Sequence, residues 1–214
     1  MPEGPRIRRI DEVPAIFTGD VGYRLVRREL GIEGFGVNAF TADAGVQLIE
    51  EHDEVGTAAA GHQELYVIIA GAARFTIDGK DYDAQPGTLV FIPDPKSQRS
   101  AKATADGTVA LAVGGAPGQP YAVSPWESSA AATGLAQDGD LEAAADVMAE
   151  AVEQHPKNPS VLYNAACFEA LAGRRELALE HILAAAAIDP ASVTKWASGD
   201  PDLDAIRDDP DFPA

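Results

Sequence analysis

The stretch GHQELYVIIAGAARFTIDG, residues 61–79, contains two strand-like segments separated by a glycine and followed by the pair Asp78-Gly79. Both segments are rich in aromatic and β-branched residues, which favour extended backbone. An Asp-Gly pair is typical of a two-residue turn between antiparallel strands. The stretch therefore predicts β-structure made of short strands. His62 and Glu64 are two residues apart, so on a strand they would point to the same face.

The same kind of sequence extends over the first half of the chain. Short runs of valine, isoleucine, phenylalanine and threonine are interrupted by glycine, aspartate and proline. Many short strands at this spacing are typical of a sandwich or a barrel. The strands are expected near residues 23–30, 34–42, 45–52, 64–71, 73–79, 87–93, 97–103 and 108–115.

The sequence changes character near residue 116, where a connection rich in glycine and proline begins. Ser124 and Glu127, three residues apart, have the spacing of a capping box at a helix N-terminus. Alanine-rich sequence of helical type follows. We therefore expect an α+β protein of two domains, a β-domain over residues 1–120 and an α-helical domain over residues 121–214.

The helical half contains a repeat of 34 residues. Small or helix-breaking residues recur at this spacing in four pairs, Gly139 and Gly173, Ala144 and Ala178, Ala151 and Ala185, and Pro156 and Pro190. With this period the sequence resembles the tetratricopeptide repeat, which has two antiparallel helices per unit. The resemblance implies a surface that binds a protein partner or a second copy of the chain. A short helix around residues 202–207 is expected to end the array.

Charge and composition exclude several classes of function. The net charge is −18, of which residues 1–120 contribute −6 (11 basic, 17 acidic) and residues 121–214 contribute −12 (5 basic, 17 acidic). A negative surface repels phosphate backbones, so we expect no nucleic-acid partner. No apolar run is long enough for a membrane span, so we expect no membrane association. The single cysteine, Cys167, excludes an internal disulfide and favours a cytoplasmic location.

Two segments of the β-half carry a resemblance to a known family. Six residues separate Glu64 from Gly71, and five separate Gly87 from Pro93. These spacings resemble parts of the two motifs of the cupin superfamily, and the likeness extends over about residues 34–115. The resemblance implies a double-stranded β-barrel, an RmlC-like jelly roll, in a family where divalent metals are common.

The resemblance also implies metal-ligand positions, at which this sequence departs from the family. Glu64 is retained, whereas Glu51 and Asp53 occupy the positions of the first two histidines. His52 lies one step away and would face inward if a bulge shifted its strand. We therefore expect that a metal, if bound, is held by His52, His62 and Glu64. Such a set suits iron, manganese, nickel or zinc, and no other cofactor is expected.

Strand alternation predicts a pocket around these residues. Tyr66 follows Glu64 on the same face and is the candidate acid–base group. Gln98 occupies the third histidine position of the cupin motifs, and the same count along its strand leads to Ser100 and Lys102. The predicted pocket for a small molecule contains His62, Glu64, Tyr66, Gln98, Ser100 and Lys102.

Each of these residues also has a plain structural interpretation. His52 would be an exposed strand end, and Tyr66 a core aromatic. His62 would be a polar residue at the barrel mouth. Glu64 would be buried with Arg99 or His62 as its partner, because a buried carboxylate without a partner is costly.

Three functions remain open from the sequence. The first is a binding module, in which the barrel holds a small molecule and the repeats hold a protein. The second is a metal-dependent enzyme of the dioxygenase, isomerase or decarboxylase type. The third is a non-catalytic scaffold. We expect a homodimer under all three, because pairing of edge strands removes exposed sheet edges.

Overall fold

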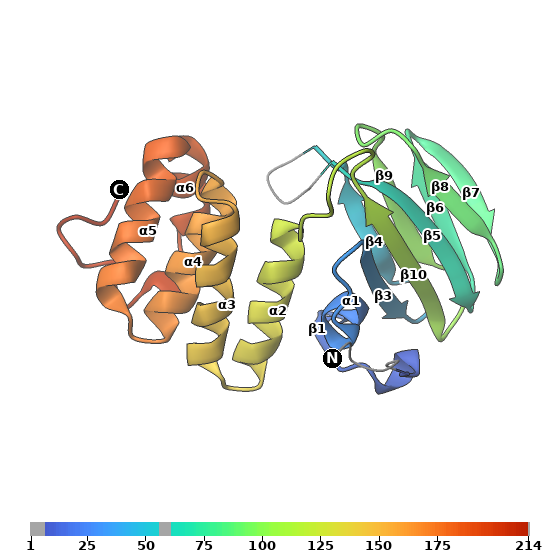
Figure 1. The fold of residues 1–214 in the computed structure, drawn as a ribbon, viewed down its shortest axis with the longest axis horizontal. Coiled ribbons are helices and arrows are strands. Elements are labelled where there is room, and N and C mark those ends of the chain that lie inside the picture. Colours follow the sequence, from blue (N-terminus) through green and yellow to red (C-terminus); the bar gives the residue numbers. More distant parts are fainter. Residues whose placement is uncertain (1–6, 56–60, 214) are drawn as a thin grey trace. The chain divides into compact units, whose positions relative to one another are not determined.

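The computed structural model of the chain describes residues 7–55 and 61–213. Contacts divide the chain into two compact units, Met1–Val123 and Ser124–Ala214, which we call unit 1 and unit 2. Strands form most of the regular structure of unit 1, and helices form that of unit 2 (Figure 1).

Unit 1 contains two antiparallel sheets. The larger sheet has the strand order β1-β2-β3-β10-β5-β8, and the smaller has the order β4-β9-β6-β7. The strands of the larger sheet are β1 (Ala15–Thr18), β2 (Val21–Arg24), β3 (Gly36–Ala42), β5 (Gln63–Ala70), β8 (Leu89–Ile92) and β10 (Thr108–Gly115). Those of the smaller sheet are β4 (Gln47–His52), β6 (Ala73–Ile77), β7 (Lys80–Ala84) and β9 (Arg99–Ala103).

The Asp-Gly pair forms the tight turn that the sequence predicts. Ile77 pairs with Lys80 across the end of the β6–β7 hairpin. Asp78 and Gly79 both have positive φ, 47° and 76°. A two-residue turn with positive φ at both positions matches the twist of the strands it joins, which is why Asp-Gly is favoured there.

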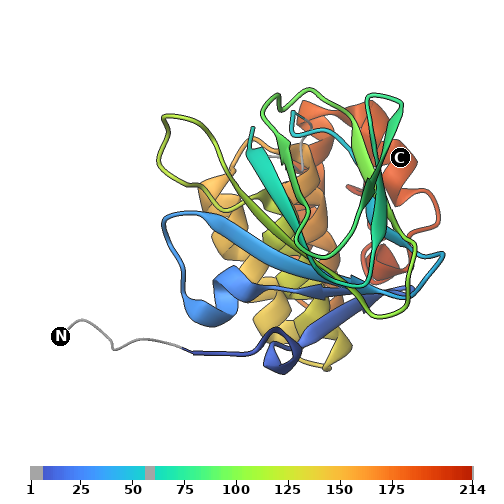
Figure 2. The same cartoon turned by 90° about the vertical axis from the view of Figure 1, so that its right-hand side faces the viewer.

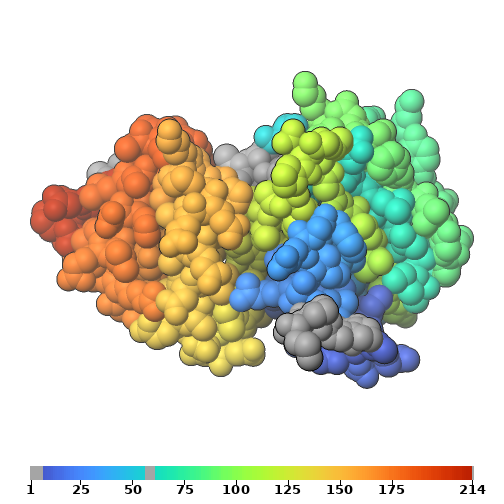
Figure 3. Space-filling model, in the orientation of Figure 1, coloured from blue at the N-terminus to red at the C-terminus, as the bar shows by residue number. Residues whose placement is uncertain are grey.

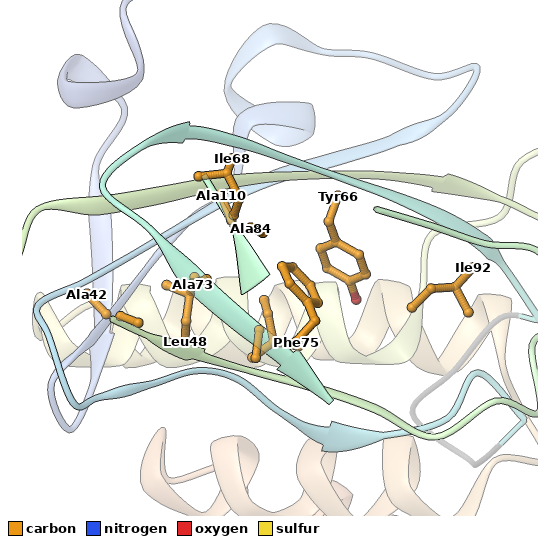
Figure 4. Packing of buried hydrophobic residues seen from close by; sticks show 12 residues of the cluster. Ala42, Leu48, Tyr66, Ile68, Ala73, Phe75, Ala84, Ile92 and Ala110 are labelled. Atoms are coloured by element: carbon orange, nitrogen blue, oxygen red, sulfur yellow. The ribbon is translucent and has the colours of Figure 1, made fainter. Parts of the chain in front are cut away.

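The two sheets face each other and bury one apolar core between them (Figure 2). Figure 4 shows Tyr66 beside Phe75 of the opposite sheet, with their ring centroids 5.4 Å apart. Both side chains are almost fully buried. The core residues are Ala42, Leu48, Ile49, Tyr66, Ile68, Ala73, Phe75, Ala84, Ile92, Ala101, Ala103 and Ala110.

The expectation of a closed barrel is corrected by the strand pairing. Within the described residues neither sheet closes on itself, because β1 and β8 are the edges of one sheet and β4 and β7 are the edges of the other. Two facing antiparallel sheets are the arrangement of a jelly roll, in which the strands are divided between two layers.

The strand expected over residues 23–30 is wrong in its second half. The chain leaves β2 at Arg24 and forms the short helix α1 (Val26–Leu30), which ends at Gly31 in the left-handed conformation with φ 61°. Such a glycine satisfies the last carbonyls of a helix. This helix lies at the surface of unit 1 (Figure 3), where two of its polar side chains are exposed.

The sequence pattern does not predict β1 and β7. β1 and β7 are edge strands with mostly exposed or half-buried residues, so neither shows a buried apolar face to reveal it. A one-turn 3-10 helix, η1 (Ile10–Glu12), precedes β1.

Unit 2 begins with the serine cap and the proline that its sequence predicts. The Ser124 hydroxyl accepts a hydrogen bond from the backbone N–H of Glu127, and proline follows the cap. The helices are α2 (Pro125–Gln137), α3 (Leu141–Gln154), α4 (Pro159–Leu171), α5 (Arg175–Ile188) and α6 (Pro190–Ala197). None of the described helices is long and apolar enough to cross a membrane.

The 34-residue spacing appears in the helices themselves. α2 and α4 start 34 residues apart, and so do α3 and α5. Gly139 and Gly173 lie in the two matching turns with φ 85° and 77°. The spacing therefore marks two successive helix pairs of the same length.

The end of unit 2 differs from the expected helix over residues 202–207. The segment forms only the 3-10 turn η2 (Pro201–Leu203), capped by the Asp200 side chain. Leu203 and Ile206 are fully buried and pack into the core of unit 2. Before it, Trp196 of α6 packs edge-on against Tyr163, with ring centroids 5.3 Å apart.

Candidate functional site

Three potential ligand groups meet at one end of the unit 1 core. His52 ends β4, Glu54 follows it, and Glu64 lies near the start of β5. Their ligand atoms all lie within 4.8 Å of one another. The Nε2 atom of His52 is 3.7 Å from Oε1 of Glu54 and 3.8 Å from Oε2 of Glu64.

A bulge brings His52 to this place. The β4–β9 register shifts between Ile49 and His52, so that His52 pairs with Arg99. An extra residue in one strand turns the following side chains to the other face. This is the shift that the sequence interpretation required for His52 to face inward.

The His52 ring has a defined orientation. Its Nδ1 lies 2.8 Å from the carbonyl oxygen of Glu50. A carbonyl oxygen only accepts, so Nδ1 carries a proton and donates it. The other nitrogen, Nε2, points to the two carboxylates and is free to hold a proton or a metal ion.

The side chain of Tyr66 holds the carboxylate of Glu64. The hydroxyl of Tyr66 donates to Oε2 of Glu64 over 2.7 Å, and the Tyr66 side chain is 1% exposed. Burial, followed by the negative charge of Glu64, raises the pKa of Tyr66 well above its ordinary value. The phenol therefore stays protonated and orients the carboxylate.

Arg99 completes the group. It is the largest fully buried side chain among the described residues, at 0% exposure, and its Nε lies 3.5 Å from Oε2 of Glu64. It starts the inward face of β9, which continues with Ala101 and Ala103. Of the two partners expected for a buried Glu64, Arg99 and His62, the structure places Arg99 in the ion pair.

The charges of the site are set by these contacts. Burial acts to raise the pKa of Glu64, but the interactions with His52 and Tyr66 outweigh it and hold that pKa below its ordinary value. Burial acts to lower the pKa of His52, but Glu64 and the Glu50 carbonyl outweigh it and raise that pKa. The carboxylates thus favour a positive charge at the position of Nε2.

His62 lies apart from this group. Its ring packs against Tyr121, with centroids 5.5 Å apart, and the side chain is buried. Burial lowers the pKa of His62. Its ligand atoms are not among those that converge with His52 and Glu64, so the structure groups Glu54 with them instead.

The residues expected on β9 lie elsewhere. The side chain of Gln98 donates to Asp53 over 3.0 Å, and its backbone is bonded to Asp78. Ser100 and Lys102 alternate with the buried face of β9 and point away from the core. The predicted alternation is one residue out of phase, because Arg99, Ala101 and Ala103 form the buried face of β9.

Glu54 and Arg99 are the site residues that the predicted pocket omits. Arg99 has a recognisable signal in the strand RSAKA, where it takes the place of an apolar residue on the alanine face. Glu54 follows the strand in an irregular segment, where no periodicity indicates which way a side chain points.

The chemistry of the three donors fits a divalent metal ion. One imidazole nitrogen and two carboxylate oxygens are the ligands that iron, manganese, nickel and zinc accept. Donor atoms bound to one ion at about 2.1 Å lie about 3–3.5 Å apart. The distances of 3.7 and 3.8 Å from Nε2 exceed that separation, and all three atoms lie within 4.8 Å of one another, so the side chains would have to move closer together to bind one ion.

Comparisons with known proteins find similarity in structure and none in sequence family. No protein-family model matches the chain, and no curated protein matches it in sequence. Several solved structures of cupin-type proteins match about half of it. A cupin protein from Bacteroides fragilis is 19% identical, covers 57% of this chain and 92% of its own, and has a TM-score of 0.43.

Two further structures give similar values. An RmlC-like cupin from Shewanella frigidimarina is 14% identical, with 55% of this chain and 97% of its own covered and a TM-score of 0.42. A predicted oxalate decarboxylase from Thermotoga maritima is 20% identical and has a TM-score of 0.41. The match covers 51% of this chain and 97% of that protein. Similarity at this level carries no argument about ligand or activity.

Proposed function

We propose that unit 1 is a binding module that holds a divalent metal ion at His52, Glu54 and Glu64, and a small molecule beside it. The observation that carries the proposal is the convergence of three ligand atoms within 4.8 Å. Two carboxylates and an imidazole nitrogen with a fixed tautomer together offer three donor atoms to a cation.

The surroundings support a site for metal rather than for a proton alone. The Glu50 carbonyl fixes the tautomer of His52, and the Tyr66 hydroxyl fixes the carboxylate of Glu64. Such supporting bonds to the ligands are a regular feature of metal sites. A bound ion would supply a Lewis-acidic centre to the small molecule. The residues of the chain would hold that ion and position the ligand.

Tyr66 is not proposed as an acid–base group. Its proton is committed to Glu64 at 2.7 Å, and its pKa is raised far from the range useful near neutrality. Binding of a small molecule therefore has more support than catalysis by this phenol.

We propose in addition that unit 2 is a tetratricopeptide-like repeat that binds a protein or a second copy of the chain. Two successive helix pairs of equal length support this reading. Four large apolar side chains remain well exposed on its helices, and repeats of this kind use such surfaces for partners. They are Leu171, Leu177, Leu183 and Ile188.

Metal binding is tested by elemental analysis of the purified protein and by calorimetric titration with Mn²⁺ and Zn²⁺. We expect about one equivalent per chain. His52→Gln and Glu54→Gln should each weaken binding at least about tenfold, because each removes one ligand.

The matched control is His62→Gln, which replaces a buried histidine of the same unit outside the ligand group. Its metal affinity should stay within about threefold of the original. If His62→Gln lost the metal and His52→Gln kept it, the ligand set would be a different one. If no ion bound to the unchanged protein, the proposal would be wrong.

A further inference from the structure

The guanidinium of Arg99 is buried without hydrogen bonds. Its three nitrogens, Nε, Nη1 and Nη2, are inaccessible to solvent, and none has a hydrogen-bond partner in the part of the chain that the structure describes. The ion pair with Glu64, at 3.5 Å, is too long to be a hydrogen bond that satisfies Nε.

An arrangement of this kind calls for an acceptor. A guanidinium has five N–H donors and cannot lose its charge, so burial without acceptors is among the costliest situations for a side chain. In native structures an unsatisfied buried group is exceptional, and an ordered water, an ion or a functional role is its usual explanation. A planar fork of donors matches the two oxygens of a carboxylate.

Among the described arginines, Arg24 also has a buried nitrogen without a hydrogen bond, but it differs from Arg99. Arg24 leaves only its Nε unsatisfied, while its Nη1 donates to the carbonyl of Val13. Arg74 and Arg174 have carboxylate partners at the surface. Arg99 is thus singled out by its full burial and by its position next to the ligand group.

Charge counting supports an anion at this place. Glu54 and Glu64 contribute two negative charges and Arg99 one positive charge. A divalent ion at the ligand group would leave one positive charge in a buried site. One anion neutralises that charge and supplies acceptors to the guanidinium at the same time.

We propose that the small molecule bound in unit 1 is a carboxylate whose oxygens accept hydrogen bonds from Arg99, beside the metal ion. This inference rests on the proposed function, because the metal supplies part of the positive charge. Arg99 selects the ligand by its charge and by the geometry of two oxygens. Neutral amides of the same shape are rejected, since they offer an N–H group where the guanidinium needs an acceptor.

The test uses the full-length protein loaded with the ion that binds it and two probes of equal shape, malonate and the neutral malonamide. Calorimetry measures the metal and the probe in separate titrations for the unchanged protein, Arg99→Met and Arg99→Lys. The matched control is Arg74→Met, which removes an exposed arginine from the neighbouring strand β6.

We expect malonate to bind and malonamide not to bind. Arg99→Met should keep the metal and weaken malonate binding at least about 30-fold, because charge-assisted hydrogen bonds are lost. The malonate affinity of Arg99→Lys should fall between those of the unchanged protein and Arg99→Met. Lysine keeps the positive charge but loses the planar pair of N–H donors. Arg74→Met should change neither affinity more than about twofold.

Two results would overturn the inference. One is malonate affinity in Arg99→Met within about threefold of the original, which would mean that the metal alone holds the anion. The other is equal binding of malonamide.

The metal titration keeps the two proposals apart. If no ion binds, the proposed metal site is wrong, and malonate is titrated into the metal-free protein. Binding that depends on Arg99 would then uphold the anion site, and its absence would refute it. If Arg99→Met does not fold, Arg99→Lys with the same two probes decides the question.

Discussion

Glu64 and Arg99 form a buried ion pair whose energetic coupling can be worked out from the structure. The side chains are 14% and 0% exposed, and Nε and Oε2 are 3.5 Å apart. With an effective dielectric constant of about 20, the attraction at this distance is about 5 kcal/mol. Breaking a buried pair from one side typically costs about 3–5 kcal/mol, because the remaining charge stays buried and unpaired.

We therefore predict non-additive losses of stability. Glu64→Gln should destabilise unit 1 by about 3–5 kcal/mol, because Arg99 is then buried without a carboxylate. Arg99→Met should cost less, because Tyr66 and His52 still hold the Glu64 carboxylate. The double variant should lose much less than the sum, with a coupling energy of about 3 kcal/mol. Arg74→Met with Asp83→Asn is the control cycle.

The control pair is closer, at 2.7 Å, but its side chains are 52% and 65% exposed. Exposed pairs contribute about 0.2–1 kcal/mol, so this cycle should give at most about 1 kcal/mol. The contrast separates the effect of burial from that of distance.

The assay is native-state hydrogen exchange on peptides from β5 and β9, with metal-free protein. Both tryptophans, Trp126 and Trp196, lie in unit 2, so their fluorescence does not report on this site. A coupling energy below about 0.5 kcal/mol for Glu64 and Arg99 would refute the reasoning. It would mean that water or another group already satisfies each charge separately.

Two further predictions concern other parts of the chain. In unit 2 the buried Glu169 accepts from Nδ1 of His181 at 2.7 Å, and this contact raises the pKa of His181. Since the folded pKa is the higher one, the extra stability is fully present below the ordinary histidine pKa of about 6.5 and is lost as the pH rises through the raised value. Urea unfolding followed by tryptophan fluorescence should show the free energy of unfolding falling as the pH rises above about 6.5. An equal fall in a His181→Gln variant would contradict this prediction. In unit 1 the edge strand β8 exposes Leu89 and Phe91 at 65% and 57%, and we propose that this edge pairs two copies of the chain. Light scattering should find a dimer that Leu89→Asp with Phe91→Asp converts to a monomer, because each apolar side chain buried contributes about 1.5–3 kcal/mol; a monomer before any substitution would contradict the pairing.

The candidate site was only partly accessible from the sequence. Glu64 and Tyr66 share a face because both lie within one regular strand, where alternation is reliable. Alternation from Gln98 predicts Ser100 and Lys102 on the inner face of β9, whereas Arg99, Ala101 and Ala103 occupy that face. A shift of one residue exchanges the two faces of a strand completely.

The sequence by itself determined the features that depend on a few neighbouring residues. Asp78-Gly79 specifies the hairpin turn, since it tolerates positive φ at both positions. Ser124 specifies the start of α2 by supplying an acceptor to a free backbone N–H. Equal spacing of glycines specifies the two helix pairs, because each turn needs the left-handed conformation.

Only the tertiary structure decided which polar side chains meet. The bulge before His52 arises in the pairing of β4 with β9, strands that are far apart in the sequence. The same pairing places Arg99 inside the core, where it meets Glu64 from the opposite sheet. The physical reason is that strand register and sheet packing depend on the whole core, whereas a sequence pattern constrains each strand only within itself.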